Sequence, residues 1–149
     1  MKIKYAHTNL IAEDWKRLSL FYIDVFGCKP KPPERNLSGK WLEELTSLPD
    51  VELKGIHLQL PGYGDEGPTL EIFEFKKNLK SENKNINKEG YAHIAFAVED
   101  VELCFDMVKK HGGSAAGEII ITEIEGVGKL HVVYARDPEG NIIEIQKWN

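Results

Sequence analysis

The sequence predicts an α+β protein made of two tandem βαβββ modules related by pseudo-two-fold symmetry. Two observations carry this prediction. YAHTNLIAED at residues 5–14 and YAHIAFAVED at residues 91–100 share Tyr, Ala, His, Glu and Asp at an offset of 86 positions. TLEIFEF at residues 69–75 and NIIEIQKW at residues 141–148 repeat an apolar–Glu–Ile pattern at an offset of 73. An internal repeat dictates the architecture, because each copy forms one supersecondary unit.

The two offsets differ by 13 positions, which indicates an insertion in the first copy between Gly27 and Glu71. We expect the extra residues in the stretch Lys29–Leu53, whose KPKPPE opening is typical of a loop. A Lys- and Asn-rich segment without hydrophobic periodicity separates the copies and indicates a solvated linker. The organisation expected for residues 1–149 is therefore a single domain with module one at 1–75, a linker at 76–89 and module two at 90–149.

In the first copy a strand is expected over Ile3–Ala12, and Asp14 is placed to cap the following helix. Apolar residues then recur at three- and four-residue spacing from Trp15 to Phe26, and Gly27 ends the helix. Three β-like runs follow, near Trp41–Leu45, Leu53–Leu60 and Thr69–Phe75. The order of these elements is β-α-β-β-β.

The second copy repeats this order. Asp100 caps a helix with an apolar stripe from Val101 to Val108, and Gly112-Gly113 ends it. Asp137-Pro138-Glu139-Gly140 predicts a type I turn between the last two strands. The β-like runs lie near Ala115–Ile121, Lys129–Ala135 and Asn141–Lys147.

Each copy places one His and one Glu on the same face of its strands. Successive strand residues face opposite sides of a sheet, so His7, Glu71, His93 and Glu144 lie opposite the apolar faces that pack on helices. A lone His or Glu at such a position is usually structural. Buried carboxylates without partners cost several kcal/mol, so their recurrence in both copies predicts a shared cation.

The remaining polar candidates have no counterpart in the other copy. His57 and His131 lie in strands without a matching His, so we expect neither to line the site. His111 follows the second helix and is interpreted as a charge at its C-terminal end. Asp65 and Glu66 belong to the Gly-rich loop PGYGDEGP and are interpreted as solvated turn residues.

Composition excludes several classes of function. The net charge is −5 and no dense Lys/Arg block occurs, so nucleic acid and membranes are not expected partners. There is no secretory signal and no long apolar run, so a cytoplasmic location is expected. Cys28 and Cys104 lack ligand spacing and are interpreted as small core or near-surface residues rather than nucleophiles. A homodimer is expected, because a small domain of this kind exposes sheet edges.

Three segments resemble the vicinal oxygen chelate superfamily, which includes glyoxalase I, bleomycin-resistance proteins and extradiol dioxygenases. They are HTNLIAEDWKRLSLFYIDVFG, GYAHIAFAVEDV and YARDPEGNIIEIQ, and the resemblance covers essentially the whole chain. It implies that curved mixed sheets form a metal-binding cup. It also implies that His7, Glu71, His93 and Glu144 hold one divalent metal, which could be Zn, Ni, Co, Mn or Fe.

The resemblance implies a lyase or isomerase that stabilises an enediolate and moves a proton next to a carbonyl of a small-molecule substrate. Glu144, or Glu71 by symmetry, would carry the proton. Ile11 stands where glyoxalase I carries an Arg that binds a glutathione carboxylate, which argues against glutathione as the substrate. Two alternatives stay open: an Fe(II)-dependent dioxygenase, and a non-enzymatic small-molecule-binding protein of the bleomycin-resistance type.

Overall fold

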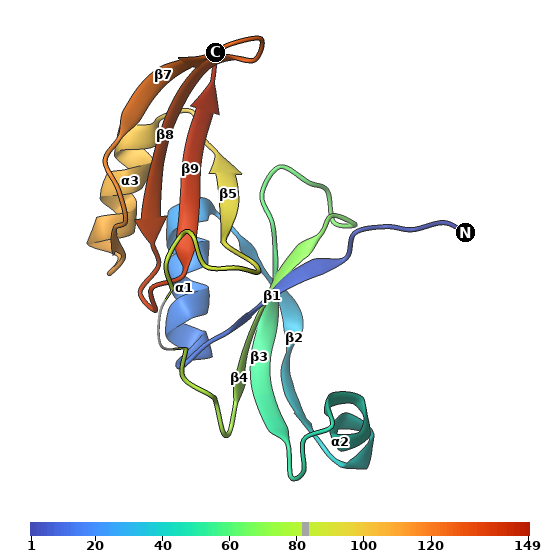
Figure 1. Cartoon of the computed structure of the whole chain (residues 1–149). Coiled ribbons are helices and arrows are strands. Elements are labelled where there is room, and N and C mark those ends of the chain that lie inside the picture. The colour runs from blue at the N-terminus through green and yellow to red at the C-terminus, as the bar shows by residue number, and fades with distance from the viewer. Residues whose placement is uncertain (82–83) are drawn as a thin grey trace. The chain divides into compact units, whose positions relative to one another are not determined.

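The computed structural model describes residues 1–81 and 84–149, so residues 82 and 83 of the predicted linker lie outside the described residues. The chain divides into two compact units, Met1–Lys80, which contains module one, and Ser81–Asn149, which contains module two; we describe them separately (Figure 1). Module one contains β1 (His7–Ile11), α1 (Trp15–Phe26), β2 (Lys29–Ser38), α2 (Lys40–Thr46), β3 (Glu52–Gln59) and β4 (Thr69–Phe75). Module two contains β5 (His93–Ala97), α3 (Val101–Lys110), β6 (Ser114–Ala115), β7 (Ile120–Ile124), β8 (Gly128–Arg136) and β9 (Ile142–Trp148).

The two modules have the same sheet topology. In module one the strand order is β1-β4-β3-β2, with β1 parallel to β4 and the other pairs antiparallel. In module two the order is β5-β9-β8, with β5 parallel to β9 and with β6 and β7 both paired to β8. Helix α1 packs against β3 and β4, and α3 packs against β8 and β9. The predicted α+β fold of two βαβββ modules with mixed sheets is confirmed.

Strand register reproduces both sequence offsets. Asn9 of β1 pairs with Glu71 of β4, and Ala95 of β5 pairs with Glu144 of β9. The predicted facing is also confirmed, since Leu70 and Ile72 on either side of Glu71 are at most 1% exposed. Ile143 and Ile145, on either side of Glu144, are fully buried. The two Glu therefore occupy equivalent positions on the sheet face opposite the helices.

The helix ends follow the predicted caps. The Asp14 carboxylate accepts hydrogen bonds from the backbone N–H groups of Lys16 and Arg17 at 3.1 and 3.0 Å. Gly27 ends α1 with a φ of 67°, in the left-handed region that glycine adopts without a steric cost. The Asp100 carboxylate likewise accepts from the N–H of Leu103 at 2.8 Å. These caps fix where each helix crosses its sheet.

Two elements of module one differ from the prediction. The KPKPPE segment was expected to be a loop, but it belongs to strand β2. Proline is tolerated there because β2 is an edge strand with a bulge between Lys31 and Arg35. The expected strand near Trp41–Leu45 is wrong, because Lys40–Thr46 forms helix α2. Leu42 on this helix is 3% exposed and packs with Val51 and Leu53, whereas Trp41 is 53% exposed.

Twelve of the 13 inserted residues are divided between two sites. Arg35 and Gly55 pair across β2 and β3 and are 20 residues apart, whereas the equivalent pair Ile120 and Val132 is 12 apart. Eight extra residues therefore lie between β2 and β3, where α2 forms. His57 and Glu71 are 14 residues apart, whereas Tyr134 and Glu144 are 10 apart, so four more lie in the β3–β4 loop. The insertion was expected in Lys29–Leu53, and this stretch holds the eight residues between β2 and β3 but not the four in the β3–β4 loop.

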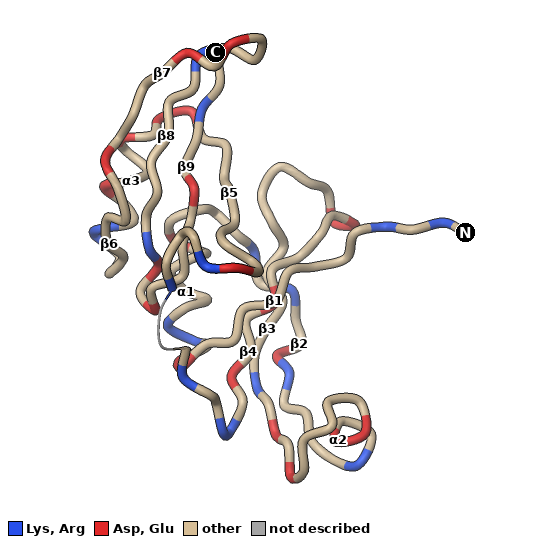
Figure 2. Tube along the Cα trace, viewed as in Figure 1, with Lys and Arg blue, Asp and Glu red and all other residues tan. Residues whose placement is uncertain are grey.

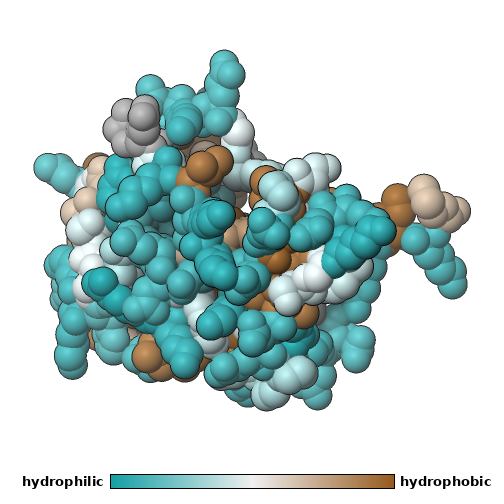
Figure 3. Space-filling view, turned by 90° about the horizontal axis from the view of Figure 1, so that it is seen from below, coloured by the Kyte–Doolittle hydropathy of each residue, from teal (hydrophilic) through white to brown (hydrophobic). Residues whose placement is uncertain are grey.

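The surface carries charge of both signs. Figure 2 shows Lys and Arg recurring along β2 and acidic residues at several strand ends and loops. The face seen in Figure 3 is mostly hydrophilic, with apolar residues in separate groups. No helix in the described parts of the chain is long and apolar enough to cross a membrane.

Candidate functional site

In module one, β1 and β4 bring His7 and Glu71 together on the face opposite α1. The Nε2 atom of His7 lies 3.3 Å from Oε2 of Glu71. The Glu71 side chain is 12% exposed and that of His7 is 44% exposed, so the carboxylate is sheltered while the imidazole edge stays accessible. The pairing follows from the parallel register, which sets His7 diagonally across from Glu71.

In module two, β5 and β9 repeat this arrangement. The Nε2 atom of His93 lies 3.3 Å from Oε2 of Glu144, with side-chain exposures of 30% and 16%. His93 and Glu144 hold the same register relation as His7 and Glu71, because each His lies two residues before the residue that pairs with the Glu. The two modules thus present the same His–Glu pair twice.

The donors in each pair fit a divalent metal ion. Two donors bound to one ion at about 2.0–2.2 Å and at right angles to each other lie about 3 Å apart, close to the separation seen in both pairs. No group of three or more His, Cys, Asp or Glu side chains within residues 1–81 and 84–149 is arranged to hold a metal. Each module therefore presents one half of the predicted four-ligand set.

His57 belongs to this site, contrary to the sequence-based expectation. It pairs with Glu71 across β3 and β4, and its Nε2 lies 2.8 Å from Oε1 of Glu71. Its Nδ1 lies 3.1 Å from Oγ1 of Thr69. A carboxylate only accepts hydrogen bonds, so a neutral His57 donates from Nε2 to Glu71 and accepts at Nδ1 from the Thr69 hydroxyl.

The surroundings of His57 favour this neutral form. Burial lowers the pKa of His57, and the negative charge of Glu71 opposes that shift. Arg35, His7 and Lys31 lower the pKa further through their positive charges. The pairing of β3 with β4 could have placed His57 beside Glu71. That pairing depends on the length of the β3–β4 loop, which differs from the length of the β8–β9 loop in module two.

Tyr134 occupies the position in module two that His57 occupies in module one. It pairs with Glu144 across β8 and β9, and its ring lies 5.3 Å from that of His93. A hydrogen bond to Glu144 raises the pKa of the Tyr134 hydroxyl, with burial and the carboxylate charge adding to the shift. Tyr134 therefore stays protonated near neutral pH and donates to Glu144.

The two Glu differ in their partners. His57 lies at Oε1 of Glu71. His7 lies at Oε2, which also accepts a hydrogen bond from the Asn9 amide at 3.3 Å. The side chains recorded at Glu144 are His93 and Tyr134. Ala95 stands where module one has Asn9, so it provides no equivalent amide donor. Glu71 is accordingly the more firmly held of the two carboxylates.

The other candidates from the sequence lie outside these pairs. His131 lies 3.2 Å from Glu102 of α3, on the helix side of its sheet, as expected. His111 forms the C-cap of α3. Cys28 and Cys104 are buried, and burial raises their pKa values to about 12 and about 11. Both thiols are therefore expected to be protonated near neutral pH.

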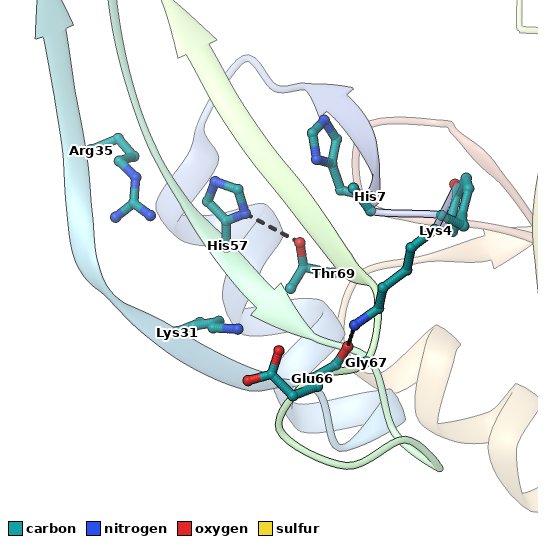
Figure 4. Close-up of a pocket in the computed structure, with 10 residues that line it drawn as sticks. Lys4, His7, Lys31, Arg35, His57, Glu66, Gly67 and Thr69 are labelled. Atoms are coloured by element: carbon teal, nitrogen blue, oxygen red, sulfur yellow. Dashed lines mark hydrogen bonds between the residues drawn. The ribbon is translucent and has the colours of Figure 1, made fainter. Parts of the chain in front are cut away.

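A cavity of about 400 Å³ opens beside the His7–Glu71 pair in module one. Figure 4 shows His7 and His57 on its walls, with Lys31 and Arg35 pointing in from β2. Glu66 lines it from the β3–β4 loop, where it is an exposed turn residue, as expected.

The sequence pattern of the Glyoxalase/Bleomycin resistance protein/Dioxygenase superfamily matches residues 4–145, and the chain belongs to this superfamily. A probable lactoylglutathione lyase from Vibrio cholerae is 28% identical over 147 residues, which cover 95% of this chain and 88% of that protein.

Solved structures share the fold. A glyoxalase family protein from Bacillus cereus superposes with a TM-score of 0.74 at 19% identity, covering 99% of this chain and 94% of that one. The trypanothione-dependent glyoxalase I of Leishmania major gives 0.64 at 24% identity, covering 98% and 87%. The genomically encoded fosfomycin resistance protein of Listeria monocytogenes gives 0.57 at 18% identity, covering 100% and 96%.

Proposed function

We propose that the chain is a divalent-metal-dependent lyase or isomerase that moves a proton next to a carbonyl group of a small substrate. The observation that carries this proposal is the repetition of the His–Glu pair. It recurs at the same register position in both modules, with the same N···O separation of 3.3 Å. The name of the Vibrio cholerae relative, a probable lactoylglutathione lyase, supports the reaction type.

His7, Glu71, His93 and Glu144 would hold the metal, which supplies a Lewis acid for a developing oxyanion when bound. The rest of the chemistry belongs to the chain itself. The His57 N–H donates to Oε1 of Glu71, and the Tyr134 hydroxyl donates to the Glu144 carboxylate. Hydrogen bonds of this kind fix the orientation of carboxylates that bind a metal.

Glu144 is the better candidate for the base that removes the proton. A general base must reach a carbon-bound hydrogen, which requires its carboxylate to turn away from its resting partners. Glu71 has more partners to lose, since His57 and Asn9 both donate to it in addition to the contact with His7. Glu144 therefore carries the proton in this proposal, and Glu71 mainly binds and orients.

Metal titration tests the first half of the proposal. The chain is freed of metal by chelation and titrated with Zn, Ni, Co and Mn by calorimetry. We expect one ion per chain for the wild type. His93→Ala should lose stoichiometric binding, whereas the matched control His111→Ala should retain it, because His111 lies at the end of α3.

Solvent deuterium exchange tests the second half. The metal-loaded chain is incubated in deuterated water with α-hydroxyketones, hemithioacetals and acyl thioesters, and exchange at the carbon beside the carbonyl is followed by NMR. Exchange with one of these classes supports the proposal. Tight, metal-independent binding of an aromatic drug without exchange would favour a binding protein, and oxygen consumption with bound iron would favour a dioxygenase.

A further inference from the structure

Three cationic side chains line the cavity beside His7, two of them from β2. Of the residues that line it, Lys4, Lys31 and Arg35 are positive and Glu66 is negative. The whole chain carries a net charge of −5, so this local excess of positive charge runs against the overall balance. A cavity lined by one sign of charge raises the local concentration of ligands of the opposite sign.

The bulge in β2 explains how two of these cations reach the same wall. Lys31 pairs with His57 and Arg35 pairs with Gly55, so four positions on β2 match two on β3. His57 and Gly55 share one face of β3, because side chains alternate along a strand. The two extra residues in β2 therefore keep Lys31 and Arg35 on the side of His57, as Figure 4 shows.

These two cations retain free hydrogen-bond donors. Lys31 Nζ donates to the carbonyl of Asp65 at 3.3 Å, and an Arg35 guanidinium N–H donates to the carbonyl of Pro33. Neither forms an ion pair with a carboxylate in the described parts of the chain. An ammonium has three donors and a guanidinium has five, so most of their donor capacity stays available for a ligand.

Module two supplies an internal comparison. Ile120 pairs with Val132 at the register position where Arg35 pairs with Gly55. The N–H of Ala116 donates to the carbonyl of Tyr134, the residue equivalent to His57. The positions that carry Arg35 and Lys31 in module one are thus apolar in module two. The positive wall is an addition to the repeated scaffold, and the β-ladder does not require it.

We propose that Arg35 and Lys31 form a subsite for an oxyanion group of the substrate, either a carboxylate or a phosphate. The substrate class is then an anionic carbonyl compound whose charged end lies against β2 while its reacting end lies toward His7. This assignment rests on the proposed function for the reacting end. The guanidinium of Arg35 provides two parallel donors that match a carboxylate or phosphate.

Binding measurements on the metal-free chain test this subsite, because an anion cannot then bind through a metal ion. The probes are glutarate, inorganic phosphate and the neutral analogue glutaramide, each titrated by calorimetry and NMR. We expect one or both anions to bind, with an affinity that falls as salt rises, and glutaramide to bind at least tenfold more weakly. The stronger of the two anions identifies carboxylate or phosphate as the natural group.

Variants locate the binding. Arg35→Gln and Lys31→Gln should each weaken anion binding by roughly 10- to 100-fold, the range for a charge-assisted hydrogen bond. Lys40→Gln is the matched control, because Lys40 lies on α2 and its side chain is 86% exposed. Circular dichroism checks that the variants fold, and Arg35→Lys should recover part of the affinity. Equal binding of glutaramide, or equal loss in Lys40→Gln, would overturn the subsite.

The subsite and the proposed reaction can fail separately. Anion binding that depends on Arg35 without deuterium exchange in any substrate class would retain the subsite and reject the reaction. Exchange in an anionic substrate with a KM unchanged by Arg35→Gln would retain the reaction and reject the subsite. Metal affinity should be the same in wild type and Arg35→Gln, which separates loss of substrate binding from loss of the metal.

Discussion

Replacing His57 by Phe tests whether this residue positions Glu71. The substitution keeps an aromatic ring on β3 and removes both ring nitrogens. Glu71 then loses the N–H donor at 2.8 Å from Oε1, and the Thr69 hydroxyl loses its acceptor at 3.1 Å. Thr69 is 7% exposed and the Glu71 side chain is 12% exposed, so water replaces these partners only in part.

The expected cost follows from these two hydrogen bonds. A hydrogen bond to a charged group contributes about 1.5–3 kcal/mol, and one between neutral groups contributes about 0.5–1.5 kcal/mol. Their combined loss should lower the free energy of unfolding of His57→Phe by about 2–4 kcal/mol. Burial keeps His57 neutral above its lowered pKa, so the measurement at pH 7.5 reports hydrogen bonds to a neutral imidazole.

The assay is urea unfolding of the metal-free chain followed by calorimetric titration with metal. A positioning role predicts a further effect that stability alone does not, namely a 10- to 100-fold weaker metal affinity in His57→Phe. His57→Gln should restore part of this affinity, because its amide can donate to Glu71. Tyr134→Phe is the matched change in module two and should cost about 1.5–3 kcal/mol, since it removes one hydrogen bond to a carboxylate.

Two results would refute the reasoning about His57. A stability change below about 0.5 kcal/mol would mean that the hydrogen bonds to Glu71 and Thr69 contribute almost nothing in solution. Unchanged metal affinity in His57→Phe would mean that Glu71 does not need His57 to bind the metal. Equal metal affinities in His57→Gln and His57→Phe would show that the donor is not what matters.

Three further predictions follow from the site and the core. Glu144→Gln should retain some metal affinity through its amide oxygen yet lose deuterium exchange by roughly 10²–10⁴-fold, and Glu71→Gln should lose less. Equal losses would contradict the assignment of the base. Cys28 and Cys104 should resist thiol reagents in the native chain at pH 8, because burial raises their pKa values to about 12 and about 11. Both should react in urea, and labelling of the native chain should rise only in strong alkali. Rapid native labelling would show that the thiols are not buried. Light scattering at micromolar concentration should show a homodimer, and a monomer alone would reject that expectation.

The sequence predicted the features that depend on local chemistry and on the repeat. Asp14, Asp100 and Gly27 lie at helix ends as expected, because capping needs only the nearest backbone groups. The two offsets predicted which positions are equivalent, and the pairing of Asn9 with Glu71 and of Ala95 with Glu144 agrees with both offsets. The facing of each His and Glu followed from strand alternation alone.

The features that were missed depend on contacts between distant segments. Three prolines in the KPKPPERNLS segment indicated a loop, but an edge strand with a bulge tolerates them. Helix α2 forms where Leu42 can pack against Val51 and Leu53, which local periodicity over seven residues does not show. His57 was excluded because it has no histidine counterpart, although its true counterpart is Tyr134. Both residues donate to a Glu, so the role is repeated while the residue type is not.

The differences between the modules are therefore as informative as the repeat. A symmetric set of two His and two Glu cannot by itself decide which way a substrate binds. His57 and Asn9 hold Glu71 in module one, where Arg35 also lines the cavity. Module two has Tyr134, Ala95 and Ile120 at the matching register positions. Ala95 gives Glu144 no amide donor, and Ile120 puts an apolar side chain where module one has the Arg35 cation. In the proposed reaction, the cations of module one would bind the charged end of the substrate, and Glu144, which has fewer partners, would take the proton. The repeat accounts for the four proposed metal ligands, and the differences at His57, Asn9 and Arg35 would allow the two modules different roles.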